Sequence, residues 1–372
     1  MRRSAWPTLI VCISTLVTRT PAVLSDDAVA AFTSGFWRRL PALPESKEQF
    51  GLEACAGRIY AIGGVCDGSE TASAFVYDID QHQWLPMAPL PREAQSLCLC
   101  AVNGRLFSFG GYDSRLGVKY EDVWLYDPNQ DVWLPRCPMP VPREDAGSAV
   151  INGQVWIIGG LTNPGHNLVS QIDVYDPNLD TWVLSTTIRP KEEDWSGRAL
   201  GDFACAIGPF LYCLGGTETM NYYSWWLQPA SWGFLTDGVT LEYIEIPDPR
   251  CYAEVEVVGG LLCIVGGCRK SLTDYADTML IYDPSSYGWK DPVLLPYAAR
   301  GQGACSWNGI LYLAGGYSGR TRQDFYQWAE HTGHDDEEAL PDDVSPADSN
   351  TDLDPPDPEL PRGRPRPTPP AP

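Results

Sequence analysis

Six short runs of strand-forming residues, each ended by a pair of glycines, decide how this chain folds. They are RIYAIGG (58–64), RLFSFGG (105–111), VWIIGG (155–160), FLYCLGG (210–216), LLCIVGG (261–267) and ILYLAGG (310–316). Aliphatic, aromatic and β-branched residues favour strands, and glycine permits the positive φ that a sharp bend needs. The runs recur about every fifty residues, which indicates a repeat architecture. We therefore expect one small β-sheet per run.

The residues that follow each run indicate how such a sheet is built. In four repeats a later strand ends in Tyr-Asp, and a tryptophan follows six residues after the aspartate. These pairs are Asp78 and Trp84, Asp127 and Trp133, Asp176 and Trp182, and Asp283 and Trp289. An aspartate at this place caps a tight turn by accepting from backbone N–H groups two residues on. The tryptophan then returns on a fourth strand, where its bulk can fill the gap between neighbouring sheets.

The glycine doublet and the spaced Tyr and Trp make the chain resemble the kelch-repeat family over residues 36 to about 328. The resemblance implies an all-β, six-bladed kelch-type β-propeller with one blade per repeat. The sixth repeat lacks a fourth strand, and an orphan strand pattern stands at Trp37. We expect this N-terminal strand to pair with the last blade and close the ring.

The repeat motifs are similar in sequence to those of animal kelch-like proteins. Those proteins usually carry BTB and BACK domains ahead of the propeller and act as substrate receptors of cullin-type ubiquitin ligases. No BTB or BACK region is recognisable in residues 1–35. The resemblance therefore covers the propeller part alone.

The two ends differ in composition from the repeats. Residues 1–35 form an N-terminal tract, residues 36–328 the propeller, and residues 329–372 an acidic, proline-rich tail that we expect to be disordered. Arg2 and Arg3 precede a short apolar stretch, so residues 1–25 also fit a secretory signal peptide. The 12 cysteines include no CxxC pair and predict neither a disulfide framework nor a zinc site. We predict a cytoplasmic protein, with secretion as the alternative.

Composition limits the class of partner. The formal charge of −22 argues against nucleic acid, because binding phosphates needs a basic surface. No stretch is long and apolar enough for a transmembrane helix, so no membrane is predicted. The expected partner is a peptide or loop of another protein.

Basic side chains recur 15 to 18 residues before each glycine pair, and we expect them to ring one mouth of the central channel. They are Lys47, Arg92, Arg143, Arg198, Arg250 and Arg300. Tyr112, Arg115, Tyr317 and Arg320 follow the glycine pairs and complete the predicted partner-binding set. Arginine and tyrosine are common anchors of protein interfaces. The alternative is that the basic residues only tie one blade to the next by hydrogen bonds.

The sequence carries no signature of catalysis, so no catalytic, cofactor-binding or metal-binding residue is predicted. Copper chemistry of the kind found in some propellers needs imidazole ligands at the channel. The four histidines, His82, His166, His331 and His334, lie in a predicted turn, a loop and the tail. We therefore predict a non-catalytic protein-interaction module, with a substrate-receptor role in ubiquitin-ligase or cytoskeletal assembly as its most specific form. The alternative is a secreted six-bladed kelch enzyme that acts on a sugar, similar to a mutarotase or epimerase.

Overall fold

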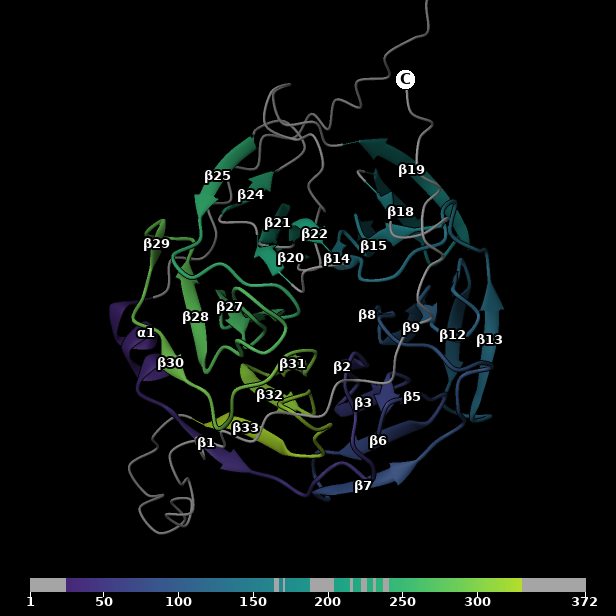
Figure 1. Cartoon of the computed structure of the whole chain (residues 1–372), viewed down its shortest axis with the longest axis horizontal. Helices are drawn as coiled ribbons and strands as arrows, with labels where there is room; N and C mark the ends of the chain where they lie inside the picture. Colours follow the sequence, from purple (N-terminus) through teal and green to yellow (C-terminus); the bar gives the residue numbers. More distant parts are fainter. Residues whose placement is uncertain are drawn as a thin grey trace, which may run out of the picture. The chain divides into compact units, whose positions relative to one another are not determined.

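The fold was analysed in a computed structural model. It describes residues 25–163, 167–169, 171–187, 204–214, 217–221, 226–229, 232–236 and 241–329. Their sheets form a ring of antiparallel blades around a central space (Figure 1). The prediction of an all-β, kelch-type propeller is therefore confirmed.

Five of the sheets are regular four-stranded blades. In the first three, every strand pairs with its neighbour in chain order. They consist of β2 (Gly51–Cys55), β3 (Arg58–Ile62), β6 (Ala74–Asp78) and β7 (Gln83–Pro86); of β8 (Cys98–Val102), β9 (Arg105–Phe109), β12 (Val123–Asp127) and β13 (Val132–Arg136); and of β14 (Gly147–Ile151), β15 (Gln154–Ile158), β18 (Gln171–Asp176) and β19 (Thr181–Thr187).

The fourth and sixth blades are also four-stranded, and the fifth has its outer strand split in two. They consist of β20 (Ala204–Ile207), β21 (Phe210–Leu214), β24 (Trp232–Thr236) and β25 (Leu241–Glu245); of β26 (Glu254–Val258), β27 (Leu261–Val265), β28 (Thr278–Asp283), β29 (Gly288–Trp289) and β30 (Val293–Leu294); and of β31 (Gly303–Trp307), β32 (Ile310–Ala314), β33 (Phe325–Ala329) and β1 (Phe36–Arg39). Each glycine-pair run supplies the second strand of a different blade.

Short hairpins follow four of the glycine pairs. They are β4 (Val65–Cys66) with β5 (Ser69–Glu70), β10 (Tyr112–Asp113) with β11 (Val118–Lys119), β16 (Leu161–Thr162) with β17 (Asn167–Leu168), and β22 (Thr217–Asn221) with β23 (Trp226–Pro229). A helix, α1 (Asp26–Thr33), precedes the first strand, and the sequence analysis did not predict it. The predicted tail and most of the N-terminal tract lie outside the described residues.

The N-terminal strand closes the ring as predicted. Strand β1 pairs antiparallel with β33, so that Trp37 lies opposite Trp328. The two indole rings meet edge to face with centroids 5.1 Å apart, and both side chains are buried. The first and last parts of the chain therefore share one blade.

The tryptophans of the outer strands join five of the blades to the blade before each of them. Trp84 Nε1 donates to the Pro41 carbonyl (2.9 Å), Trp133 Nε1 to Ala88 (2.9 Å) and Trp182 Nε1 to Cys137 (3.2 Å). Trp37 and Trp289 make the same bond to Leu294 and Glu245. These tryptophans were predicted to pack between neighbouring blades, and each also donates a hydrogen bond from one blade to the next.

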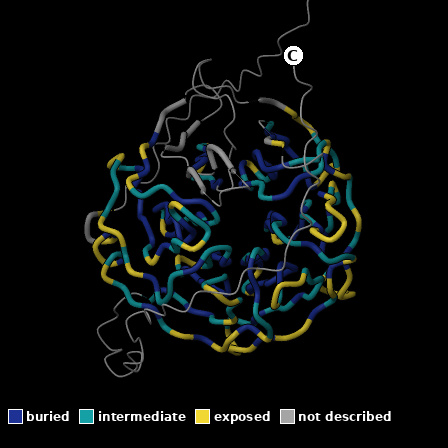
Figure 2. The backbone as a smooth tube through the Cα atoms, viewed as in Figure 1, coloured by how far each residue is buried: buried dark blue, intermediate teal, exposed yellow. Residues whose placement is uncertain are grey.

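Burial decreases from the inner strands of the ring toward its rim. The inner and middle strands are largely buried, whereas exposed residues gather on the rim and in the loops (Figure 2). The buried apolar side chains form separate clusters between neighbouring blades, each drawing on two sheets. This arrangement leaves the centre of the ring for polar groups.

Candidate partner-binding face and central channel

One mouth of the ring is built from two kinds of segment that pair with each other. In five of the blades, the connection into the inner strand forms an isolated antiparallel bridge with the residue after the glycine pair; the connection into the fourth lies outside the described residues. The bridges are Glu48–Val65, Gln95–Tyr112, Glu144–Leu161, Cys251–Cys268 and Arg300–Tyr317. We call these connections, together with the loops after the glycine pairs, the mouth face. The two sets of residues predicted to act together are therefore neighbours in space.

The glycine pairs tie successive blades together at this face. The N–H of the second glycine donates to a carbonyl in the next connection: Gly64 to Ala94, Gly111 to Arg143, Gly267 to Ala299 and Gly316 to Lys47. The last of these bonds joins the sixth blade to the first. A Cβ at Gly63, where φ is 64°, would lie 2.7 Å from the Ala94 carbonyl oxygen, so this close approach requires glycine.

Three of the predicted basic residues are buried and do not face a mouth. Lys47, Arg143 and Arg250 are 0, 1 and 2% exposed. Each donates to the carbonyl of the first glycine of the pair that follows: Lys47 Nζ to Gly63 (2.9 Å), Arg143 NH1 to Gly159 (3.1 Å) and Arg250 NH1 to Gly266 (3.3 Å). The predicted basic ring is wrong for these three positions, and the hydrogen-bonding alternative describes them.

Each buried cation also has an acidic neighbour. Lys47 pairs with Glu45 (2.9 Å), Arg143 with the fully buried Asp173, and Arg250 with Asp248 (2.8 Å). Burial lowers the pKa of all three basic groups, and the acidic partner opposes that shift in each case. Glu45 and Asp248 lie in the same connection as their cations, and Asp173 lies on β18 of the blade that Arg143 enters, so these pairs stabilise the start of single blades.

The other predicted basic residues occupy different positions of the repeat. Arg92 lies two residues before the buried position and Arg300 one residue after it, because Ala94 and Ala299 take that position. Arg92 stacks on Tyr120, 3.6 Å from the ring centroid, and pairs with Asp122. The six residues are therefore not one repeated position, and Arg198 lies outside the described residues.

The remaining predicted residues lie in the loops after glycine pairs. Arg115 is exposed and pairs with Glu93. Tyr112 is half-buried beside Lys119, whose ammonium lies 4.8 Å from the ring centroid. Tyr317 is half-buried, and Arg320 is exposed. No ion pair is found for Arg320 among the described residues.

Arginine and tyrosine side chains gather where the fifth and sixth blades meet. The Arg300 guanidinium lies 5.0 Å from the ring centroid of Tyr317 and 5.9 Å from that of Tyr252. The ring of Tyr275 meets that of Tyr317 at 6.4 Å, and its hydroxyl accepts from the Gly319 N–H (3.2 Å). With Arg320, these residues form what we call the Arg–Tyr patch.

Arg269, which neighbours the Arg–Tyr patch, has closer acidic partners than Arg300 has. It bonds Asp248 at 3.0 Å and Asp277 at 3.2 Å. Arg300, in contrast, has one distant carboxylate, Glu48 at 3.9 Å. Of the two, Arg300 keeps more of its charge available to an acidic group.

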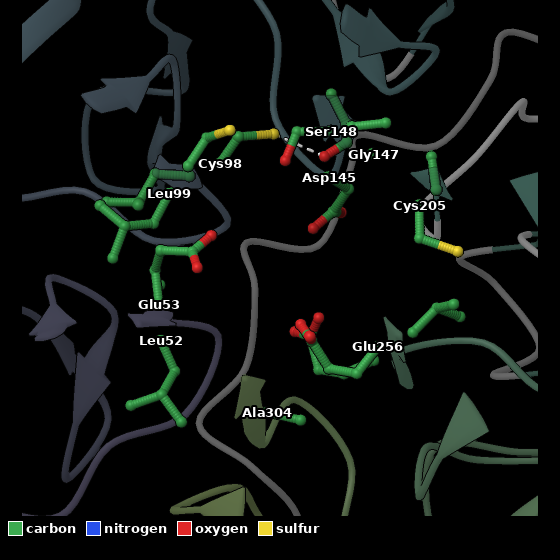
Figure 3. A pocket seen from close by; sticks show the side chains of 18 of the residues that line it. Leu52, Glu53, Cys98, Leu99, Asp145, Gly147, Ser148, Cys205, Glu256 and Ala304 are labelled. Carbon is green, nitrogen blue, oxygen red and sulfur yellow. Dashed lines mark hydrogen bonds between the residues drawn. The ribbon is translucent and has the colours of Figure 1, made fainter. Parts of the chain in front are cut away.

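The centre of the ring contains a cavity of about 320 Å³ lined by the inner strands and by the residues at their entry, among them Gln49, Ser96 and Asp145. Figure 3 shows the carboxyl groups of Glu53, Asp145 and Glu256 directed into this space. Neither Glu53 nor Glu256 was predicted from the sequence. Alternation along the inner strands was the signal that could have found them, since Glu53 lies between apolar neighbours.

Burial changes the acidity of the channel carboxyls. It raises the pKa of Glu53 to about 8, although the N–H groups of Ala54 and Ala101 lower it in part. Burial also raises the pKa of Glu256, and the nearby charges of Glu53 and Glu254 act in the same direction. At neutral pH Glu53 therefore keeps a proton that an exposed carboxyl would lose, and the pKa of Glu256 is shifted in the same direction.

Two other kinds of site were sought in the described part of the chain. It contains no group of three or more His, Cys, Asp or Glu side chains placed to hold a metal ion. It also contains no helix with the length and apolar character that a membrane span needs.

Comparison with known proteins agrees with the architecture. The family described as KLHDC2/KLHL20/DRC7 Kelch-repeats domain matches residues 50–234. Residues 50–234 therefore match a kelch-repeat family model, and the ring has the kelch-type propeller architecture. The chain is also similar to Kelch-like protein 40 of mouse, 33% identical over 76 residues, and of human, 35% identical over 75 residues. Kelch-like protein 26 of mouse is 40% identical over 86 residues.

These similarities cover short stretches. The match to mouse Kelch-like protein 40 spans 20% of this chain and 12% of that protein, and the match to Kelch-like protein 26 spans 23% and 14%. A solved structure entitled "Structure of YjhT" superposes with a TM-score of 0.63 at 15% identity, covering 77% of this chain and 95% of the other. At that identity the superposition supports the kelch fold alone.

Proposed function

We propose that this kelch domain is a non-catalytic protein-interaction module, and that it binds a peptide or loop of a partner on the mouth face. The observation that carries the proposal is the Arg–Tyr patch, in which Arg300 lies beside Tyr252 and Tyr317 with the exposed Arg320 nearby. Arginine offers a planar pair of donors to a carboxylate, and tyrosine offers rigid amphipathic area. The expected ligand therefore carries at least one acidic side chain or a terminal carboxylate.

The contacts of the other mouth-face residues support a division of roles. Lys47, Arg143 and Arg250 are occupied by backbone carbonyls and acids within the propeller. Arg92 is half-buried and pairs with Asp122, and Arg115 is exposed and pairs with Glu93 and with Asp113 (3.8 Å); a partner would have to displace these acids. We place Arg92, Arg115 and Tyr112 at the margin of the interface and the Arg–Tyr patch at its centre.

The similarity to kelch-like proteins suggests a wider role. A substrate receptor in a ubiquitin-ligase or cytoskeletal assembly would use such a face to hold the substrate, and we propose this as the most specific form of the function. The expected compartment is the cytoplasm.

Affinity capture with matched variants tests the proposal. The tagged full chain and its Arg300→Ala/Arg320→Ala variant are used to capture proteins from a lysate, and the retained proteins are quantified by mass spectrometry. Removing two central anchors of an interface should reduce a specific partner at least about tenfold. Arg58→Ala is the control, because Arg58 is exposed at the end of β3 away from the glycine pair. Equal capture by all three proteins would refute the assigned site.

One observation favours a second candidate function. Carboxyl groups with raised pKa values in a cavity are a recurrent feature of enzymes, and Glu53 and Glu256 have this property in the channel. A sugar-processing propeller would use them as acid and base. Turnover in a screen of free sugars that is lost on Glu53→Gln would establish this candidate in place of the interaction module.

A further inference from the structure

Two cysteines face each other at the mouth of the fifth blade. Cys251 and Cys268 form the isolated bridge of this blade, and their backbones exchange both hydrogen bonds, N–H to O distances being 3.0 and 2.8 Å. Their sulfur atoms are 3.5 Å apart, and both side chains are 0% exposed. At the same place the first, second, third and sixth blades carry Glu48–Val65, Gln95–Tyr112, Glu144–Leu161 and Arg300–Tyr317. The cysteine pair is therefore particular to the fifth blade.

The backbone around this pair has the spacing of a disulfide. Directly opposed residues that exchange both hydrogen bonds in an antiparallel pair have Cα atoms about 5.5 Å apart, which is within the usual range for disulfide-bonded cysteines. The sulfur atoms need only a small side-chain rotation to reach bonding distance. Tyr252 and Leu272 pack against the two sulfurs, so a bond formed there would be shielded from solvent.

We propose that Cys251 and Cys268 are a redox modification site that forms a disulfide with a small-molecule disulfide, such as oxidised glutathione, as the oxidant. When the loop from Cys268 to Ala276 opens locally and exposes the two buried sulfurs, the thiolate of one cysteine attacks the glutathione disulfide, forms a mixed disulfide and releases one glutathione. The thiolate of the other cysteine attacks the mixed disulfide and releases the second glutathione. Two protein thiols are oxidised, one glutathione disulfide is reduced to two thiols, and the two protons lost by the cysteines pass to the departing sulfurs.

The disulfide would clip the base of the loop that contributes to the Arg–Tyr patch. This loop runs from Cys268 to Ala276, where the Ala276 N–H returns to the Gly267 carbonyl (2.8 Å), and its residues include Arg269 and Tyr275. A bond to Cys251 joins the loop to the connection that carries Tyr252. Oxidation therefore stabilises the native arrangement of the patch. The disulfide itself does not depend on the proposed function, but any effect on partner affinity rests on it.

The test maps disulfides in the full chain. The folded protein is incubated with oxidised glutathione, its remaining thiols, most of them buried, are blocked with N-ethylmaleimide in denaturant, and it is cleaved with chymotrypsin without reduction. The fragments that contain Cys251 and Cys268 should remain joined, with a mass lower by two hydrogen atoms, and should separate on reduction. The Tm should rise by several degrees on oxidation, because the bond closes a loop in the unfolded chain.

Cys263→Ala is the matched control, because Cys263 is also fully buried and lies between the two cysteines in sequence. It should keep the link and the shift in Tm, whereas Cys251→Ala and Cys268→Ala should lose both. Hydrogen–deuterium exchange of residues 269–275 should slow severalfold on oxidation of the wild type and stay unchanged in Cys251→Ala. Separate blocking of Cys251 and Cys268 after oxidation, or a link through Cys263, would overturn the proposal. The mapping needs no partner, so its failure and that of the interaction module are distinct.

Discussion

Buried basic residues bond the start of a blade to the glycine pair of that blade. Arg143 contacts the Gly159 carbonyl and pairs with Asp173, both inside the protein. Arginine at this position joins the start of one blade to its glycine pair, which in turn bonds the neighbouring blade. A basic residue near a glycine pair therefore has a structural task before any task in binding.

Replacing Arg143 should destabilise the fold. Arg143→Met leaves the Asp173 carboxylate buried without its cation, and we expect a loss of about 3–5 kcal/mol in the free energy of unfolding. Arg320→Ala, at an exposed position, should change it by less than about 0.5 kcal/mol. Denaturant unfolding followed by tryptophan fluorescence measures both. Similar values for the two variants would contradict the structural role of Arg143.

The channel carboxyl Glu53 should make stability depend on pH. Its pKa is raised from 4.5 to about 8 in the folded state, so the folded protein binds the proton more tightly than the unfolded chain does. Its contribution to stability is present below pH 4.5 and is lost as pH rises through 8. Water in the channel screens the charge, so the slope from this group is less than about 1.4 kcal/mol per pH unit.

The comparison of wild type with Glu53→Gln isolates that contribution. The amide cannot ionise, so the variant should gain stability relative to wild type as pH rises from about 5 to 9. Unfolding free energies at a series of pH values are the measurement. A constant difference across this range would mean that Glu53 titrates with an ordinary pKa.

At the scale of single elements, the closing strand β1 is the part whose loss is most informative. Trp37 is buried against Trp328 and donates to the Leu294 carbonyl of the fifth blade. One side chain thus connects the closing strand to its own blade and to the previous one.

Trp37→Ala should therefore weaken closure of the whole ring. Removing a buried tryptophan costs about 3–5 kcal/mol. The matched substitution is Arg39→Ala on the same strand, where the arginine is largely exposed, and it should cost less than about 1 kcal/mol. Thermal unfolding of both variants tests this, and a Trp37→Ala protein as stable as wild type would show that the ring does not need this strand.

The strands were predictable because their signal is local. The glycine pairs end β3, β9 and β15 at the expected residues, and Asp127 and Asp176 cap the expected turns through the N–H groups of Asn129 and Asn178. Closure by β1 was also predictable, since a missing strand and an orphan strand match. Helix α1 was missed, because eight residues at the edge of an apolar tract carry little periodicity.

At the scale of the whole molecule, side-chain direction is what the sequence could not show. A window of 15 to 18 residues before each glycine pair grouped Lys47, Arg92 and Arg300, yet these occupy three different positions of the repeat. The isolated bridges show which residues of different blades are equivalent, and these bridges form only in the folded ring. The same holds for Cys251 and Cys268, which are 17 residues apart in sequence and in contact in space.

The folded molecule also shows where charged groups lie in a chain whose formal net charge is −22. Acidic groups line the central cavity, whereas the Arg–Tyr patch presents Arg300 and the exposed Arg320. An acidic peptide would be repelled by most of the protein and attracted to the Arg–Tyr patch. Charge therefore contributes to specificity as well as to affinity.

We propose above all that a protein partner binds the mouth face at the Arg–Tyr patch. The most direct measurement is hydrogen–deuterium exchange of the propeller with and without a captured partner. We expect slower exchange in residues 268–277 and 315–322, with the outer strands β7 and β13 unchanged. Protection confined to those outer strands, with the two loops unaffected, would contradict it.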